Sequence, residues 1–254
     1  MLPYIDCFDI AIYTFPIILT IGFLLCVVFF IARKSYDKTF YKTYVKMIFW
    51  ILPSSLLGGK IISVLSLVFQ NKGCLLECII QSGTVYYGCL FGGAISLFIL
   101  AKFYHMYWLD IFDICASLLP LGQAIGRIGC FLNGCCYGCQ YYGFASVLYP
   151  INGEIVSVFP TWFCESIFCF ILFFLLQIIL IRTNSGIITT VYLICYSSFR
   201  FIIEFLRGDS IRGTFSGVST SQILSVAVFI FAIFLYYISK QRNVKNNLLL
   251  EEKS

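Results

Sequence analysis

Arg127 and Arg200 are the residues whose type and setting point most directly to chemistry. Each lies within a long apolar stretch, where an ionised side chain is costly and therefore indicates a functional site. A guanidinium group binds a phosphate through two parallel hydrogen bonds. The two arginines thus predict a site for a phosphate-bearing lipid headgroup. The alternative for Arg127 is a helix-packing segment whose arginine reaches up to the membrane surface.

Arg200 belongs to a group of charged residues in the stretch 196–209. Arg200 and Glu204 are four residues apart and share one face of a helix, and Arg207 follows three residues after Glu204. This spacing predicts an ion pair close to the same lipid site. The alternative is an intrahelical pair that only offsets its own desolvation cost.

Four of the thirteen cysteines are crowded together in a short segment: Cys130, Cys135, Cys136 and Cys139. Most of the other cysteines lie in apolar runs and are interpreted as small hydrophobic residues. The Cys-x-x-Cys pair at 136–139 is compatible with a redox pair or with half of a metal site, but a partner set with ligand spacing is missing. We therefore predict no metal and no cofactor, and leave the oxidation state of these four thiols open.

The composition indicates that membrane-embedded elements must position these residues. Of 254 residues, 60% are hydrophobic and 11% are charged, whereas soluble domains have about 25% charged residues. The mean hydropathy of +0.93 is typical of a chain that has a bilayer as its solvent. The net charge of +5 is too diluted by apolar residues to indicate a nucleic-acid-binding protein.

Seven segments are long and apolar enough to cross a membrane as helices, which takes about 20 residues. They cover residues 11–32, 45–69, 83–102, 110–132, 160–182, 186–206 and 217–239. The predicted fold is an all-α integral membrane bundle of about seven helices, with residues 1–240 as one transmembrane domain and 241–254 as a short tail. Proline and glycine interrupt the second and fourth segments, which predicts that these two face a polar cavity.

The distribution of lysine and arginine predicts the orientation. Eleven fall in the connections after the first, third and fifth segments and in the tail, and three fall in the opposite connections. The positive-inside rule then puts the N-terminus outside and the tail in the cytoplasm. We expect no signal peptide, because residues 1–10 contain no lysine or arginine. Arg127 and Arg200 both fall at the outer end of their helices, and the only histidine, His105, falls on the cytoplasmic side.

The start of the third segment offers a further candidate region at the same outer end. Residues 82–93 contain paired tyrosines, including Tyr87, and several glycines that could line the same cavity. An aromatic belt at the membrane interface is an equally good interpretation. Glu165, near the outer start of the fifth segment, is expected to point inward.

Three stretches resemble the motifs of the prolipoprotein diacylglyceryl transferases. The first, GRIGCFLNGCCYG, is similar to the signature of that family and keeps Gly126, Arg127, Gly129, Phe131, Asn133 and Gly138. The second is the more specific and keeps Tyr196, Phe199, Arg200, Glu204, Phe205 and Arg207. Pro160 and Glu165 match a third, shorter motif. The likeness covers about residues 10–240.

The resemblance implies transfer of a diacylglyceryl group from phosphatidylglycerol to the lipobox cysteine of lipoprotein precursors in a bacterial plasma membrane. It implies that Arg127, Asn133, Gly138, Tyr196, Arg200 and Arg207 belong to the phosphatidylglycerol-binding site. It also implies that Arg127, Arg200, Glu204 and Tyr87 take part in the reaction, with Glu204 orienting Arg200. The expected partners are phosphatidylglycerol and the precursor signal peptides, with no nucleic acid.

Several positions depart from the family pattern. Tyr87 stands where the family has a histidine that is thought to take the proton of the substrate thiol, and Phe15 replaces a tyrosine. Cys130 and Cys135 replace an asparagine and a glutamate. A tyrosine with a pKa near 10 is a poor base at neutral pH. Two alternatives therefore stay open: a transferase that uses the same lipid with another acceptor, and a non-catalytic lipid-binding or transport protein.

Overall fold

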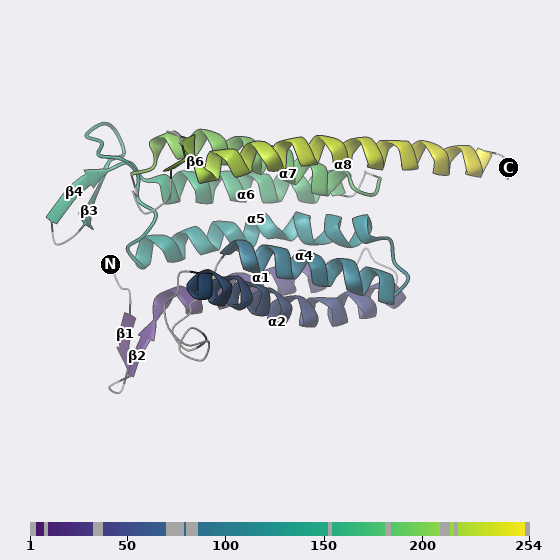
Figure 1. Ribbon diagram of the computed structural model, residues 1–254, viewed down its shortest axis with the longest axis horizontal. Helices are drawn as coiled ribbons and strands as arrows, with labels where there is room; N and C mark the ends of the chain where they lie inside the picture. The colour runs from purple at the N-terminus through teal and green to yellow at the C-terminus, as the bar shows by residue number, and fades with distance from the viewer. Residues whose placement is uncertain are drawn as a thin grey trace. The chain divides into compact units, whose positions relative to one another are not determined.

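The structure, a computed structural model, describes residues 4–7, 10–32, 38–69, 79, 86–151, 154–180, 184–208, 214–215 and 218–251. The described helices are α1 (Thr14–Ala32), α2 (Lys38–Phe69), α4 (Tyr86–Phe103), α5 (Trp108–Leu132), α6 (Thr161–Leu180), α7 (Ile187–Ile203) and α8 (Thr220–Glu251). A short 3-10 turn, η1 (Glu204–Leu206), follows α7. The helices appear as coiled ribbons in Figure 1.

Each of the seven predicted segments overlaps one of these helices, although α2, α4, α5 and α8 extend beyond the predicted bounds. Six helices are long and apolar enough to cross a membrane, and the apolar stretch Gly88–Phe103 of α4 is somewhat shorter. The start of the third predicted segment, at 83–85, lies outside the described residues. The prediction of an all-α, multi-pass membrane protein is confirmed.

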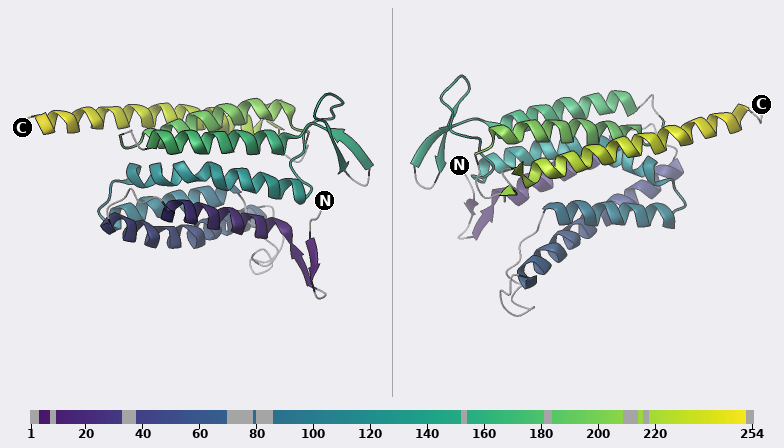
Figure 2. Two further views of the ribbon diagram at one scale, coloured as in Figure 1. Left: turned by 180° about the vertical axis from the view of Figure 1, so that it is seen from behind. Right: turned by 45° about the horizontal axis from the view of Figure 1, so that its top comes forward.

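The chain divides into two compact units, residues Met1–Arg33 with Asp113–Ser254, and residues Lys34–Phe112. In the first unit, α6, α7 and α8 lie side by side in each view of Figures 1 and 2. Leu172 and Leu176 of α6 pack against Ile188 and Tyr192 of α7 in a buried apolar cluster. This packing holds the end of α7, with Arg200, next to the start of α6.

Asp113 fixes the other end of α7. Its carboxylate accepts hydrogen bonds from the backbone N–H of Gly186 (2.6 Å) and from the N–H and hydroxyl of Thr189 (2.8 and 2.6 Å). The first N–H groups of a helix have no partner within the helix, and its N-terminus favours negative charge. A buried carboxylate on α5 therefore sets where α7 begins.

Glycines of both α1 and α5 allow these two helices to approach closely within the first unit. A Cβ placed on Gly129 of α5 would lie 3.2 Å from side-chain atoms of Ile18 and Phe15, and one on Gly22 of α1 would lie 3.3 Å from Ile125. Small residues permit this kind of helix contact in membranes. The glycines around Arg127 thus serve helix packing, which is one of the two interpretations that the sequence allowed.

The second unit contains the interrupted helix α2. A Cβ on Gly58 would lie 2.5 Å from the carbonyl oxygen of Gly88 on α4, so the two backbones are in contact there. Nearby, the hydroxyls of Ser54 and Ser96 are 2.8 Å apart. Glycine in the second segment therefore marks a close helix contact.

The long connection after α5 contains extended chain. Strands β3 (Val147–Ile151) and β4 (Glu154–Val158) pair antiparallel, with Val147 opposite Val158. Two further hairpins pair β1 (Tyr4–Cys7) with β2 (Ile10–Tyr13) and β5 (Thr214–Phe215) with β6 (Val218–Ser219). Helix α8 continues to Glu251, well into the segment 241–254 expected as a tail. That segment is rich in Leu, Lys and Glu, which favour helix.

Candidate functional site

Arg200 and Glu204 form an ion pair at the end of α7. Arg200 Nη2 lies 2.7 Å from Glu204 Oε2, and both side chains are largely buried. The pairing predicted from their spacing is confirmed. The start of α8 completes the pair, because Arg200 Nη2 donates to Ser221 Oγ at 3.3 Å and the hydroxyl of Ser219 donates to Glu204 Oε1.

A second ion-pair group joins three separate elements. Arg127 Nη2 of α5 lies 2.6 Å from Glu165 Oε2 of α6, and Arg207 Nη1, just after η1, lies 3.2 Å from Glu165 Oε1. Glu165 is buried, as expected from its position at the start of α6. One carboxylate thus holds two arginines, and Arg207 pairs with Glu165 although it lies closer in sequence to Glu204.

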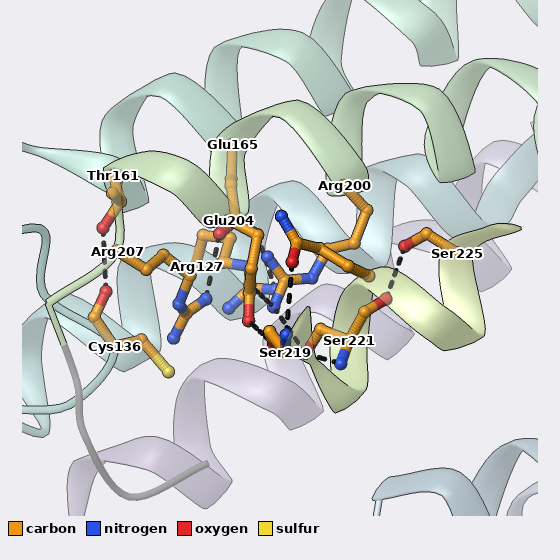
Figure 3. Close-up of polar contacts among 11 residues, drawn as sticks. Arg127, Cys136, Thr161, Glu165, Arg200, Glu204, Arg207, Ser219, Ser221 and Ser225 are labelled. Carbon is orange, nitrogen blue, oxygen red and sulfur yellow. Dashed lines mark hydrogen bonds and ion pairs between the residues drawn. The ribbon is translucent and has the colours of Figure 1, made fainter. Parts of the chain in front are cut away.

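The five charged residues of these two groups, which we call the arginine cluster, are Arg127, Glu165, Arg200, Glu204 and Arg207. Figure 3 shows them together with Ser219 and Ser221. Three positive and two negative side chains leave one positive charge in excess. Arg200 Nη1 is buried, and no hydrogen-bond partner for it is found within the described part of the chain. A buried guanidinium nitrogen that has no partner costs free energy, and an anion would satisfy it.

Gly138 positions Arg207. The two residues form an isolated antiparallel bridge, and Gly208 N–H donates to the carbonyl of Tyr137 at 3.2 Å. A Cβ on Gly138 would lie 2.3 Å from the carbonyl oxygen of Phe159, so a larger residue does not fit. Gly138 therefore keeps the chain after η1 against the loop that follows α5.

The other predicted site residues are placed as follows. Tyr196 lies one turn before Arg200 on α7 and interacts electrostatically with Arg127. Asn133 is exposed just after α5. Tyr87 lies in α4 of the second unit, and its side chain is outside the described residues.

The end of α5 brings three cysteine thiols together. The Sγ atoms of Cys130, Cys135 and Cys136 lie within 4.8 Å of one another, whereas Cys139 is not part of this group. Thiol hydrogen bonds with Cys130 and Cys135, and the positive charges of Arg207 and Arg127, lower the pKa of Cys136, although burial opposes them. The Cys-x-x-Cys spacing at 136–139 therefore did not identify the residues that converge.

Sequence reasoning missed Ser219 and Ser221 as members of the site. The signal was present, because Ser219 and Gln222 have the spacing of a capping box. In the structure, Ser221 N–H donates to Ser219 Oγ and Ser219 N–H donates to Gln222 Oε1, each at 3.2 Å. A capping box predicts the start of α8, but it does not predict the contact of Ser219 with Glu204.

The chain also matches known proteins along almost its whole length. A family model described as prolipoprotein diacylglyceryl transferase matches residues 4–238. The chain belongs to this family. The match includes every residue of the arginine cluster and the three converging cysteines.

Relatives from several bacteria bear the same family name. Phosphatidylglycerol--prolipoprotein diacylglyceryl transferase 2 of Clostridium perfringens (strain 13 / Type A) is 32% identical, over 94% of this chain and 96% of the relative. The transferase of Clostridium tetani (strain Massachusetts / E88) is also 32% identical, with 93% and 97% covered. That of Finegoldia magna is 28% identical, with 94% and 96% covered. Family membership thus rests on full-length similarity.

Proposed function

We propose that this member of the transferase family moves the diacylglyceryl group of phosphatidylglycerol to a cysteine thiol of lipoprotein precursors. The cysteine sulfur forms a bond to the glycerol carbon of that group while the bond from this carbon to the phosphate oxygen breaks. The oxygen keeps the electron pair and leaves as glycerol phosphate, and the thiol proton passes to solvent. The product is a thioether.

The observation that carries this proposal is the arginine cluster with its buried Arg200 Nη1, for which the described residues offer no hydrogen-bond partner. A phosphate diester carries one negative charge, which matches the single positive charge left over in the cluster. Arg127 and Arg207 are already held by Glu165, so their positions are fixed before a lipid arrives. Donors that are fixed in advance stabilise the charge that develops on a leaving group without reorganisation.

Each member of the cluster has a distinct proposed role. Arg127 and Arg200 bind the phosphate and neutralise the leaving glycerol phosphate, and Arg207 adds positive charge. Glu204 orients Arg200 through their 2.7 Å ion pair. Glu165 acts as a positioning residue for the other two arginines.

The remaining predicted residues have supporting roles in this proposal. Tyr196, close to Arg127, and Asn133, at the end of α5, contribute to the lipid-binding region. Gly138 acts through the backbone by positioning Arg207. Tyr87 shapes the acceptor side of the site or gives weak help in proton transfer.

The proposed setting is the outer leaflet of a bacterial plasma membrane. The excess of lysine and arginine in alternate connections favours an N-terminus outside and a C-terminus in the cytoplasm. With that orientation the arginine cluster faces the outer surface, where lipoprotein precursors carry their lipobox cysteine.

The test combines purified full-length protein, phosphatidylglycerol and a lipobox peptide. We expect mass spectrometry to find a diacylglyceryl adduct on the peptide cysteine and an equal amount of released glycerol phosphate. A peptide with serine in place of the cysteine serves as the control and should give neither product. Release of glycerol phosphate without a peptide adduct would contradict the identification of the lipobox cysteine as the acceptor. Bound lipid with neither product would contradict the catalytic proposal as a whole.

A further inference from the structure

The thiols of Cys130, Cys135 and Cys136 converge next to the arginine cluster. All three Sγ atoms lie within 4.8 Å of one another. Thiolates bound to one tetrahedral zinc ion at about 2.3 Å are separated by about 3.8 Å. Rotation of the side chains by a small amount would therefore bring all three sulfurs to ligand distance.

The backbone around the cysteines explains why they converge. Cys135 N–H donates to the carbonyl of Cys130, and Gly134 N–H donates to that of Phe131, at 3.2 and 3.4 Å. Gly134 has a φ of 80°. These features form a Schellman motif, which ends a helix by folding the chain back over its last turn. The motif places Cys135 beside Cys130.

Buried residues of α6 hold the next part of this turn. Cys136 has a φ of 63°, which non-glycine residues adopt rarely. The hydroxyl of Thr161 donates to the carbonyl of Cys136, and the indole N–H of Trp162 donates to that of Cys135, both at 2.8 Å. Thr161 and Trp162 are almost completely buried. The three thiols are therefore positioned by the protein.

The charge of the surroundings suits a bound cation with three thiolates. Three thiolates and one divalent cation carry a net charge of minus one. Arg127 lies one helical turn before Cys130 on the same face of α5, and Cys136 interacts electrostatically with Arg207 and Arg127. Figure 3 shows Cys136 at the end of the cluster where Arg127 and Arg207 lie. The arginines can offset this negative charge.

The donor set selects the metal. Sulfur ligands favour Zn²⁺ over Mg²⁺ or Ca²⁺, which prefer oxygen. Within the described residues the group has three members, and a tetrahedral ion takes four ligands. Sites with three protein ligands keep the fourth position for water or substrate.

We propose that Cys130, Cys135 and Cys136 bind one Zn²⁺ as three thiolates, and that its fourth position takes the thiol of the acceptor peptide. The three cysteine thiols release their protons to solvent as they bind the ion, and water takes the fourth position. The acceptor sulfur then displaces that water and forms a bond to zinc, and its own proton leaves to solvent. The metal site stands on the cysteine geometry, whereas the role of the fourth position rests on the proposed function. This replaces the expectation, drawn from spacing alone, that the chain holds no metal.

The first test measures metal alone. The reduced full-length protein is stripped with a chelator, titrated with Zn²⁺ and analysed for bound metal; a parallel sample receives Co²⁺. We expect one metal ion per chain and the absorption bands of tetrahedral cobalt thiolate. Replacing all three cysteines by serine should abolish both signals, whereas Cys139→Ser should retain them. Metal binding that survives the triple substitution, or a wild-type chain that binds no metal, would overturn the site.

A variant that disturbs the support of the cysteines tests whether the protein preforms the metal site or whether the thiols lie close together only by chance. Thr161→Val removes the hydrogen bond to the Cys136 carbonyl without changing the size of the side chain. Loss of such supporting contacts weakens metal binding roughly tenfold or more. An unchanged affinity, in a variant that keeps the thermal stability of the wild type, would contradict the preformed site.

The second test addresses the fourth position. A lipobox peptide added to the cobalt-loaded protein should change the thiolate absorption bands, and the same peptide with serine for cysteine should not. Unchanged bands would overturn the acceptor role while leaving the metal site intact. Equal transfer rates with and without metal would also overturn that role, and the proposed function would stand. Failure of transfer in both states would instead count against the proposed function.

Discussion

At the scale of single residues, Glu165 has the most demanding position in the arginine cluster. Its carboxylate is buried and pairs with Arg127 at 2.6 Å and with Arg207 at 3.2 Å. Breaking a buried ion pair leaves an uncompensated charge, which costs far more than the loss of a surface pair. Replacing Glu165 should therefore lower the stability of the protein as well as its activity.

We predict that Glu165→Gln destabilises the protein by about 3–5 kcal/mol, the usual cost of removing one partner from a buried pair. Thermal unfolding in detergent measures the change. Glu154→Gln is the control, because Glu154 is exposed on β4 and should leave the melting temperature unchanged. Equal melting temperatures for Glu165→Gln and the wild type would show that the two ion pairs contribute little.

The residue scale also shows what sequence reasoning can reach. The positions of Arg127, Arg200 and Glu204 in apolar segments predicted the cluster, because a charge in a membrane span needs a partner or a ligand. The partner of Arg207 could not be predicted in this way. Arg207 lies three residues from Glu204, but the bridge to Gly138 directs it to Glu165 on another helix.

At the scale of elements, the segment 137–141 makes the contact between the loop after α5 and the chain that follows α7. Gly138 packs against the backbone of Phe159, where a Cβ would lie 2.3 Å from the carbonyl oxygen. Backbone cannot move aside as a flexible side chain can. The fit of this segment therefore determines where Arg207 lies.

We predict that Gly138→Ala lowers stability by about 1–3 kcal/mol through overpacking and reduces activity by displacing Arg207. Gly143→Ala is a matched control in the same loop. A Cβ there would meet the hydroxyl end of the Tyr141 side chain, which can rotate away. Thermal unfolding and the transfer assay, applied to both variants, check the prediction; similar losses in the two would contradict it.

Helix α7 depends on a contact with α5 at its opposite end. The carboxylate of Asp113 accepts three hydrogen bonds from Gly186 and Thr189. Asp113→Ala should lower the free energy of unfolding by about 1.5–3 kcal/mol, because it leaves buried N–H groups without an acceptor. Thermal unfolding measures this, with Glu154→Ala as the exposed control. A melting temperature within error of the wild type would show that water or another group replaces the carboxylate.

The elements themselves were largely predictable. Runs of about 20 apolar residues predicted where the helices lie. The convergence of the three thiols was not predictable from the Cys-x-x-Cys spacing. It depends on a Schellman turn and on hydrogen bonds from Thr161 and Trp162, which are distant in sequence.

At the scale of the whole molecule, the charge of the connections sets the proposed orientation. The proposed orientation, which rests on the loop charges, has the C-terminus in the cytoplasm. We predict that green fluorescent protein fused after Ser254 fluoresces in a bacterial host and that alkaline phosphatase fused there is inactive. The opposite pair of results would place the arginine cluster at the cytoplasmic face, and the proposed access from the outer leaflet would be wrong.

The central claim is that the buried arginines bind the phosphate of the lipid donor. The most direct measurement is the rate of thioether formation under single turnover, with saturating phosphatidylglycerol, for Arg127→Ala, Arg200→Ala and the exposed control Lys102→Ala. Removing one preorganised donor costs about 10²–10³-fold in rate. We predict losses of this size for Arg127→Ala and Arg200→Ala and none for Lys102→Ala. A folded Arg127→Ala or Arg200→Ala variant that reacts at the wild-type rate would contradict the account.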